Sequence, residues 1–154
     1  MTQVTPSNRS RPATEPVAES GAPTIRYRMT SRRPDSASER ERWNGALREL
    51  QGNLLQSWQW GELKARHGWR VERVSVEGAW GKAMAQVLFR HRGPISLAYI
   101  PRGPVLAGDR TRAFEELTRA VDRAARAHHA ISLIVEPNGR LGLEGTYRQA
   151  GYIR

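Results

Sequence analysis

The chain is 154 residues long, contains no cysteine and carries a formal net charge of +10. The lack of cysteine excludes disulfides and thiolate chemistry, and no apolar run approaches the roughly 20 residues needed to span a bilayer. The N-terminus lacks the apolar stretch of a secretory signal, so we expect a cytoplasmic protein. The charge favours phosphate-bearing or membrane-surface partners, although 23 arginines against 2 lysines also fit the codon bias of a GC-rich genome.

Residues 1–45 are predicted to form a disordered, basic tail. They contain five prolines, eight arginines and many Ser and Thr residues, with almost no apolar periodicity. Such a segment cannot bury enough apolar surface to offset the entropy lost on ordering. Residues 46–154 are therefore expected to form the folded part of the chain, and this part is itself basic.

The first half of this folded part predicts one helix and three strands. A helical pattern runs from Leu54 to about His67, with Asn53 as N-cap and Gly68 as the residue that ends the helix. Alternating apolar side chains, separated by turns that contain glycine, predict strands at 69–76, 82–90 and 95–100. We expect these strands to form an antiparallel meander.

The second half predicts a helix, a strand and a short last helix. Asp109 has the chemistry of an N-cap for a helix from Thr111 to His128. Residues 130–135 have the composition of a compact buried strand, and the last helix is expected over 143–150. The complete order resembles that of the GNAT-type acyltransferase fold, an α/β (α+β) fold in which helices flank a mixed, mostly antiparallel sheet.

Two short segments carry the functional signal. In the segment 56–69, Trp60 and Lys64 are one helical turn apart. In the segment 99–105, an apolar strand ends in a rigid Pro-Arg-Gly-Pro loop that contains Arg102. A lysine on an exposed helical stripe suits a diphosphate, and an arginine on a rigid loop offers forked donors to carboxylate or phosphate. Together the two segments suggest a cleft for a large anionic substrate.

Each of these residues also has a purely structural interpretation. Trp60 could fill the core, Lys64 could be solvated, and Tyr99 could anchor a strand edge through its hydroxyl. Arg102 and Gly103 could belong to a turn that is kept for its geometry, with glycine supplying an unusual φ.

The residues identify neither a catalytic base nor a metal site. Glu136, at the end of a predicted strand, is conceivable as a base but is better placed to cap a turn. The four histidines lack the spacing of metal ligands, so no metal is predicted. The glycine-rich loop with which GNAT enzymes bind the coenzyme A pyrophosphate is absent from the sequence.

The two segments resemble the Fem family of peptidoglycan aminoacyltransferases, which attach an amino acid from aminoacyl-tRNA to the stem peptide of a cell-wall precursor. The matching features are the Gln-Ser-x-x-Trp-Gly-x-x-Lys pattern, the Tyr-x-Pro-Arg-Gly-Pro-Val loop and an Ile-x-Leu-Ile-Val-Glu-Pro segment, in that order. The resemblance implies that a UDP- or lipid-linked muropeptide is bound by Trp60, Lys64, Tyr99, Arg102 and Gly103. Lys64 would contact a precursor phosphate, and Tyr99 and Arg102 would lie near the sugar–peptide portion. Aminoacyl-tRNA would be the co-substrate, with no cofactor.

The resemblance covers only the first of the two GNAT-like domains that family members have. It implies that residues 46–154 are a precursor-binding half, with the second domain missing or supplied by another chain. The family commonly has an aspartate where this sequence has Ala107, and the nearest aspartate is Asp109. Two alternatives stay open: a stand-alone GNAT-like N-acyltransferase that uses acyl-CoA, and a basic RNA-binding module.

Overall fold

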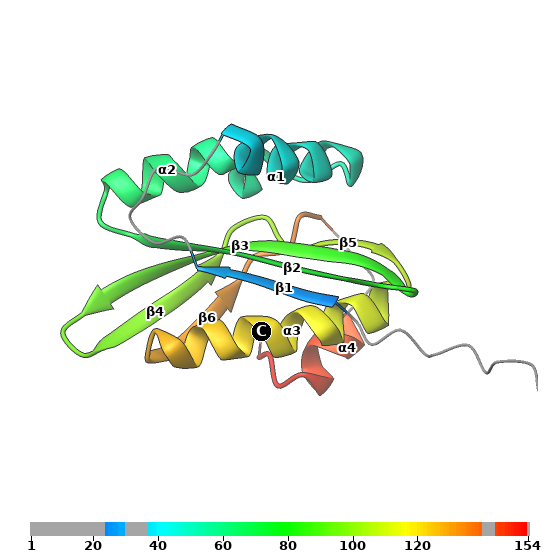
Figure 1. Cartoon of the computed structure of the whole chain (residues 1–154). Coiled ribbons are helices and arrows are strands. Elements are labelled where there is room, and N and C mark those ends of the chain that lie inside the picture. Colours follow the sequence, from blue (N-terminus) through cyan, green and yellow to red (C-terminus); the bar gives the residue numbers. More distant parts are fainter. Residues whose placement is uncertain (1–23, 30–36, 140–143, 154) are drawn as a thin grey trace, which may run out of the picture.

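The computed structural model describes residues 24–29, 37–139 and 144–153, and in it a central sheet lies between two layers of helices (Figure 1). The helices are α1 (Ala37–Glu49), the short 3-10 helix η1 (Leu54–Gln56), α2 (Trp58–Arg66), α3 (Arg110–Ala127) and α4 (Glu144–Gln149). The strands are β1 (Thr24–Met29), β2 (Arg70–Gly78), β3 (Gly81–Arg92), β4 (Ile95–Ile100), β5 (Val105–Gly108) and β6 (Ala130–Val135). Helices α1 and α2 cover one face of the sheet, and α3 and α4 lie on the other.

The sheet has the order β1-β2-β3-β4-β6, and β5 pairs with the first part of β3. All neighbouring strands are antiparallel except β4 and β6, which are parallel. The predicted meander of three strands and the predicted fold, a mostly antiparallel sheet flanked by helices, are confirmed. The strand β5 was not predicted, because its four residues follow directly on a proline-containing loop.

Alternation along β3 divides the molecule into a core face and a polar face. Ala83, Ala85, Val87 and Phe89 point toward the apolar stripe of α3, and the even-numbered residues between them point toward α1 and α2. Asp109 caps α3 as predicted, since its side chain accepts a hydrogen bond from the Arg112 backbone nitrogen. In the part of the chain that the structure describes, no helix combines the length and the apolar character needed to cross a membrane.

The prediction of a disordered tail up to residue 45 is wrong for two segments. Strand β1 pairs with β2 along its whole length, and α1 buries Trp43 and Leu47 against Trp58 and Met84. The sequence signal was weak because only these two residues of α1 are buried among charged neighbours, so the helix gains its stability from tertiary packing. The rest of the predicted tail, 1–23 and 30–36, lies outside the described residues.

Strand β6 has the predicted bounds, but the prediction that it is buried is wrong. Ile131 and Ile134 are 70% and 47% exposed, because β4 is the only neighbour of β6 among the strands that the structure describes. His128 is the C-cap of α3. Its Nε2 lies 2.8 Å from a carboxylate oxygen of the buried Glu72, which ties the end of α3 to β2.

The place of α1 in the fold can be tested at Leu47, which is 5% exposed. Leu47→Ala should lower the free energy of unfolding by about 2–5 kcal/mol, because it opens a cavity between α1 and the sheet. Urea denaturation followed by tryptophan fluorescence measures this change. Glu49→Ala, at the exposed end of the same helix, should change it by less than about 0.5 kcal/mol. Equal effects of the two substitutions would contradict the packing of α1.

Candidate substrate-binding site

Helix α2 begins and ends at residues that fix its place on the sheet. Asn53 caps η1 by accepting a hydrogen bond from the Leu55 nitrogen, and Ser57 caps α2 by accepting one from the Trp60 nitrogen. Gly68 follows α2 with a φ of +79°, a conformation that favours glycine. The helix predicted from Leu54 is thus two helices that meet at Ser57, and its predicted end at Gly68 is confirmed.

The first group of site residues, the lysine cluster, consists of Trp60, Lys64, Trp69 and Arg90. The Lys64 ammonium lies 4.9 Å from the ring centroid of Trp60 and 5.8 Å from that of Trp69. The Arg90 guanidinium lies 5.6 Å from the Trp69 centroid and donates a hydrogen bond of 2.6 Å to the carbonyl oxygen of His67. Two cations therefore share one aromatic ring, at distances typical of cation–π contacts.

The second group, the arginine cluster, consists of Tyr99, Arg102 and Glu136. The Tyr99 hydroxyl donates a 2.5 Å hydrogen bond to one carboxylate oxygen of Glu136, and the Arg102 Nε lies 3.2 Å from the other. The hydrogen bond to Glu136 raises the pKa of Tyr99, burial and the negative charge of Glu136 raise it further, and the charge of Arg102 opposes the rise. Glu136 thus contacts both predicted residues, which the sequence could not show because Glu136 lies 34 positions after Arg102.

Glu136 also fixes the Pro-Arg-Gly-Pro loop through its backbone. Its nitrogen donates to the Ile100 carbonyl oxygen, and its carbonyl oxygen accepts from the Gly103 nitrogen, both at 3.0 Å. The suggestion that Glu136 holds a turn therefore agrees with the structure, and its side chain has a further role in the arginine cluster. Arg102 itself has a φ of +47°, which is uncommon for a residue with a side chain and which surrounding contacts must maintain.

Two buried glutamines connect the loop to α2 and to β3. Gln56 and Gln86 have no exposed surface. Gln56 Nε2 donates a 2.6 Å hydrogen bond to the Pro101 carbonyl oxygen, and Gln56 Oε1 accepts one of 2.6 Å from the Gln86 backbone nitrogen. Gln86 Nε2 donates to the Ser57 and Leu55 carbonyl oxygens at 3.0 and 3.2 Å. From the sequence, Gln56 was only part of the Gln-Ser-x-x-Trp-Gly-x-x-Lys pattern, and Gln86 was only one residue of a predicted strand.

The two clusters lie on the same face of the sheet. Leu88 and Tyr99 are direct partners across β3 and β4, and so are Arg90 and Leu97. Arg90 and Tyr99 are therefore diagonal neighbours, with Cα atoms about 7–8 Å apart and side chains on one face. Four of the five predicted binding residues thus lie in two adjoining clusters, and the fifth, Gly103, is a buried residue of the Pro-Arg-Gly-Pro loop itself.

The residues near the position where the family commonly has an aspartate have other roles here. Ala107 is part of β5, where it pairs with Lys82 of β3. Asp109 caps α3. Neither residue contributes a carboxylate to the two clusters.

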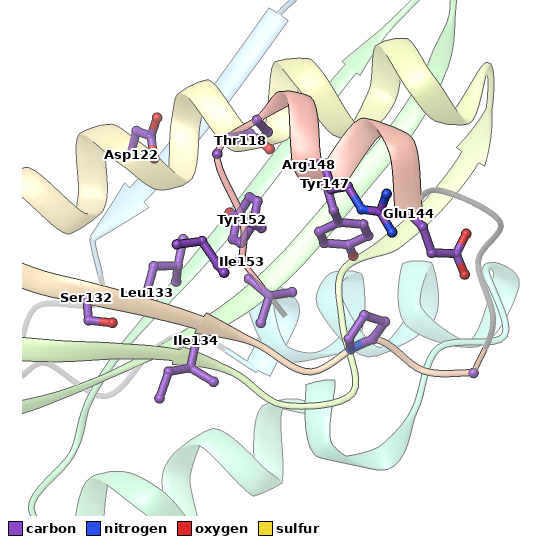
Figure 2. Close-up of a pocket in the computed structure, with 15 residues that line it drawn as sticks. Thr118, Asp122, Ser132, Leu133, Ile134, Glu144, Tyr147, Arg148, Tyr152 and Ile153 are labelled. Carbon is purple, nitrogen blue, oxygen red and sulfur yellow. The ribbon is translucent and has the colours of Figure 1, made fainter.

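A pocket of about 790 Å³ lies between β6 and α4 and includes none of the predicted binding residues (Figure 2). Its lining combines the apolar Leu133 and Ile134 with the phenols of Tyr147 and Tyr152. Burial raises the pKa of both phenols, that of Tyr152 to about 12, so both are neutral at physiological pH. The charged residues of this lining are Asp122, Glu144 and one cation, Arg148, so it matches an anionic substrate less well than the three cations of the two clusters do.

These features define the class of the protein as an α/β domain that presents fixed cations on one face of its sheet. The FemAB family profile matches residues 37–146, more than half of the sequence, and the chain belongs to this family. Curated relatives named lipid II:glycine glycyltransferase include one from Staphylococcus haemolyticus, 33% identical over 90 residues, and one from Staphylococcus saprophyticus, 35% identical over 91 residues. The alignments cover 56% and 57% of this chain and 22% of each relative, so the chain spans about a fifth of their length.

A solved structure of FemX has a similar fold. It superimposes with a TM-score of 0.59 and 25% sequence identity, over 77% of this chain and 31% of that chain. The likeness therefore covers most of the three-layer architecture described above, and it supports the family assignment independently of the two glycyltransferases.

The glycine of the Trp-Gly pair in α2 has a steric role that can be tested. A Cβ at Gly61 would lie 2.7 Å from the Arg73 guanidinium and closer still to the side-chain oxygen of Gln86. Gly61→Ala should therefore destabilise the fold by about 1–3 kcal/mol, because the buried glutamine or α2 must move. Gly45→Ala is the matched control, because the nearest atom there, on Arg48, is 4.0 Å away.

Thermal and urea denaturation of both glycine variants measure the difference. In α1, Gly45→Ala should stabilise the protein by about 0.5–1 kcal/mol, since alanine is the better helix former. A stabilising effect of Gly61→Ala of the same size would show that α2 does not lie directly on the sheet.

Proposed function

We propose that this chain is the precursor-binding domain of a peptidoglycan bridge aminoacyltransferase. In this proposal it binds a UDP- or lipid-linked muropeptide, and the precursor then receives an amino acid from aminoacyl-tRNA. The observation that carries the proposal is the pair of cations, Lys64 and Arg90, held on Trp69 beside Arg102 on one face of the sheet. Membership of the FemAB family and the names of the curated relatives support it.

The lysine cluster suits the diphosphate of such a precursor. Lys64 and Arg90 both lie near the ring of Trp69, so two positive charges border one aromatic surface on the face assigned to the precursor. The ammonium is a compact point charge, and the guanidinium is a planar fork with several donors. Because the aromatic rings and the His67 carbonyl oxygen already restrict these side chains, less conformational entropy is lost when a ligand binds.

The arginine cluster suits the sugar–peptide portion. The Arg102 side chain is 48% exposed, and Glu136 holds its Nε edge, so the outer edge of the guanidinium can meet a substrate carboxylate. Tyr99 is fixed by the same carboxylate and offers an aromatic surface beside it. The two clusters together would hold an extended, anionic molecule at both of its polar parts.

The chemical step needs more than these clusters provide. Attack of an amine on an aminoacyl ester requires removal of a proton from the nucleophile and stabilisation of a tetrahedral oxyanion. Both carboxylate oxygens of Glu136 are engaged by Tyr99 and Arg102, so we assign Glu136 to positioning and not to proton transfer. We assign the transfer step to a second GNAT-like domain, on the same or another polypeptide, as the family resemblance implies.

The two lysines of the chain allow a matched test of the proposal. Lys64→Ala should weaken binding of a UDP-linked muropeptide by about tenfold or more, because a charge-assisted contact to phosphate is lost. Lys82→Ala removes the same charge from β3, where Lys82 lies 3.9 Å from Glu77, and should leave the affinity unchanged. Titration calorimetry measures both. The proposal fails if the native chain shows no binding at millimolar ligand, or if both variants lose affinity equally.

A further inference from the structure

We propose that Gln56 is a positioning residue that sets where Arg102 stands relative to Lys64. The inference rests on the proposed function, because Lys64 and Arg102 are there assigned to the same substrate. Gln56 itself does not contact the substrate.

A single amide group connects the two halves of the site. Gln56 directly precedes Ser57, the cap of the helix that carries Lys64. Its Nε2 donates to the carbonyl oxygen of Pro101, the residue directly before Arg102, and its Oε1 accepts from the Gln86 nitrogen in β3, both at 2.6 Å. The amide thus joins the start of α2, the middle of the sheet and the cationic loop.

The backbone around Gln56 is held by hydrogen bonds that do not involve the Gln56 side chain, so the Pro-Arg-Gly-Pro loop is the segment that depends on this side chain. The Trp43 indole nitrogen donates a 2.8 Å hydrogen bond to the backbone oxygen of Gln56. The Gln86 side chain holds the carbonyl oxygens of Leu55 and Ser57, one residue to either side. If the Gln56 amide is lost, this segment of backbone therefore stays in place, and the loop loses its restraint on the α2 side.

The loop needs such a restraint because of its own conformation. Arg102 has a φ of +47°, in a region that side chains disfavour. Glu136 holds the loop from the β6 side through the Gly103 nitrogen, and Gln56 holds it from the α2 side. A Cβ on Gly103 would lie 2.9 Å from the Gln56 side-chain amide, so the loop also packs directly against it. The two restraints together maintain the backbone that directs Arg102.

Only an amide meets both requirements of this position at neutral pH. Pro101 presents a buried acceptor and Gln86 a buried donor, and a glutamine side chain supplies one complementary group to each. Methionine of similar size supplies neither, so both backbone groups would lose their partners. Gln56→Met is therefore the direct test, and Gln59→Met, at an exposed position on the first turn of α2, is the matched control.

Nuclear magnetic resonance of the ligand-free chain tests the placement itself. In Gln56→Met the carbonyl ¹³C signal of Pro101 and the Nε–H signal of Arg102 should shift, and the backbone amide signal of Lys64 should keep its chemical shift. Gln59→Met should leave all three unchanged. Unchanged signals of Pro101 and Arg102 in the Gln56 variant would overturn the proposal.

A double-mutant cycle on the affinity for a UDP-linked muropeptide tests the consequence. Arg102→Ala should weaken binding by a factor that is about threefold or more smaller in the Gln56→Met background than in the native chain. Coupled residues do not contribute independently, and Arg102 is already misplaced in that background. The loss caused by Lys64→Ala should be the same in both backgrounds. An undiminished loss for Arg102→Ala would assign Gln56 to stability alone. If the native chain does not bind the muropeptide, the proposed function fails, and the two spectroscopic signals still decide the role of Gln56.

Gln56→Glu covers the case in which the methionine variant does not fold. A neutral carboxyl can accept from Gln86 and donate to Pro101, whereas a carboxylate cannot donate. Burial raises the pKa of such a carboxyl by up to several units. Relative to the native chain at the same pH, this variant should bind the muropeptide normally at pH 6 and lose affinity as the pH rises toward 9. A constant ratio of the two affinities over that range would overturn the proposal.

Discussion

The site face of this protein depends on one buried contact, the amide pair of Gln56 and Gln86 between α2 and the sheet. Buried polar groups in a folded protein need hydrogen-bond partners, and here the Gln56 amide and the Gln86 Nε2 are paired with backbone groups of η1, Ser57, β3 and the Pro-Arg-Gly-Pro loop. The geometry of one amide thereby fixes three segments that are distant in sequence. Gly61 belongs to the same arrangement, because it lets α2 approach the Gln86 side chain without a Cβ between them.

The two clusters on this face use different means to hold a cation in place. Lys64 and Arg90 lie on tryptophan rings, and Arg102 is paired with Glu136. Exposed ion pairs of the Arg102 kind contribute only about 0–1 kcal/mol to stability, so the clusters add little to the fold. Their effect is to restrict flexible side chains before a ligand arrives, which lowers the entropic cost of binding. A stable core and a prepared surface are thus separate parts of one small domain.

The sequence predicted correctly those features that depend on neighbouring residues in the chain, such as helix caps and strand bounds. The caps at Asn53 and Asp109, the end of α2 at Gly68 and the bounds of β4 and β6 agree with the sequence. Helix α1 escaped prediction because its two buried residues gain their partners from α2 and β3. The exposure of β6 depends on which strands flank it, and its composition carries no such information.

The same distinction applies to the site. Trp60 and Lys64 are one turn apart, so their contact follows from helical spacing. The partners Trp69, Arg90 and Glu136 come from other elements, and only the register of β2, β3, β4 and β6 brings them near. A crystal structure of the chain with a UDP-linked muropeptide would test the whole account. It should show the diphosphate within hydrogen-bond distance of Lys64 and Arg90, and the sugar–peptide portion against Tyr99 and Arg102. A muropeptide seated between β6 and α4, with both clusters unoccupied, would contradict it.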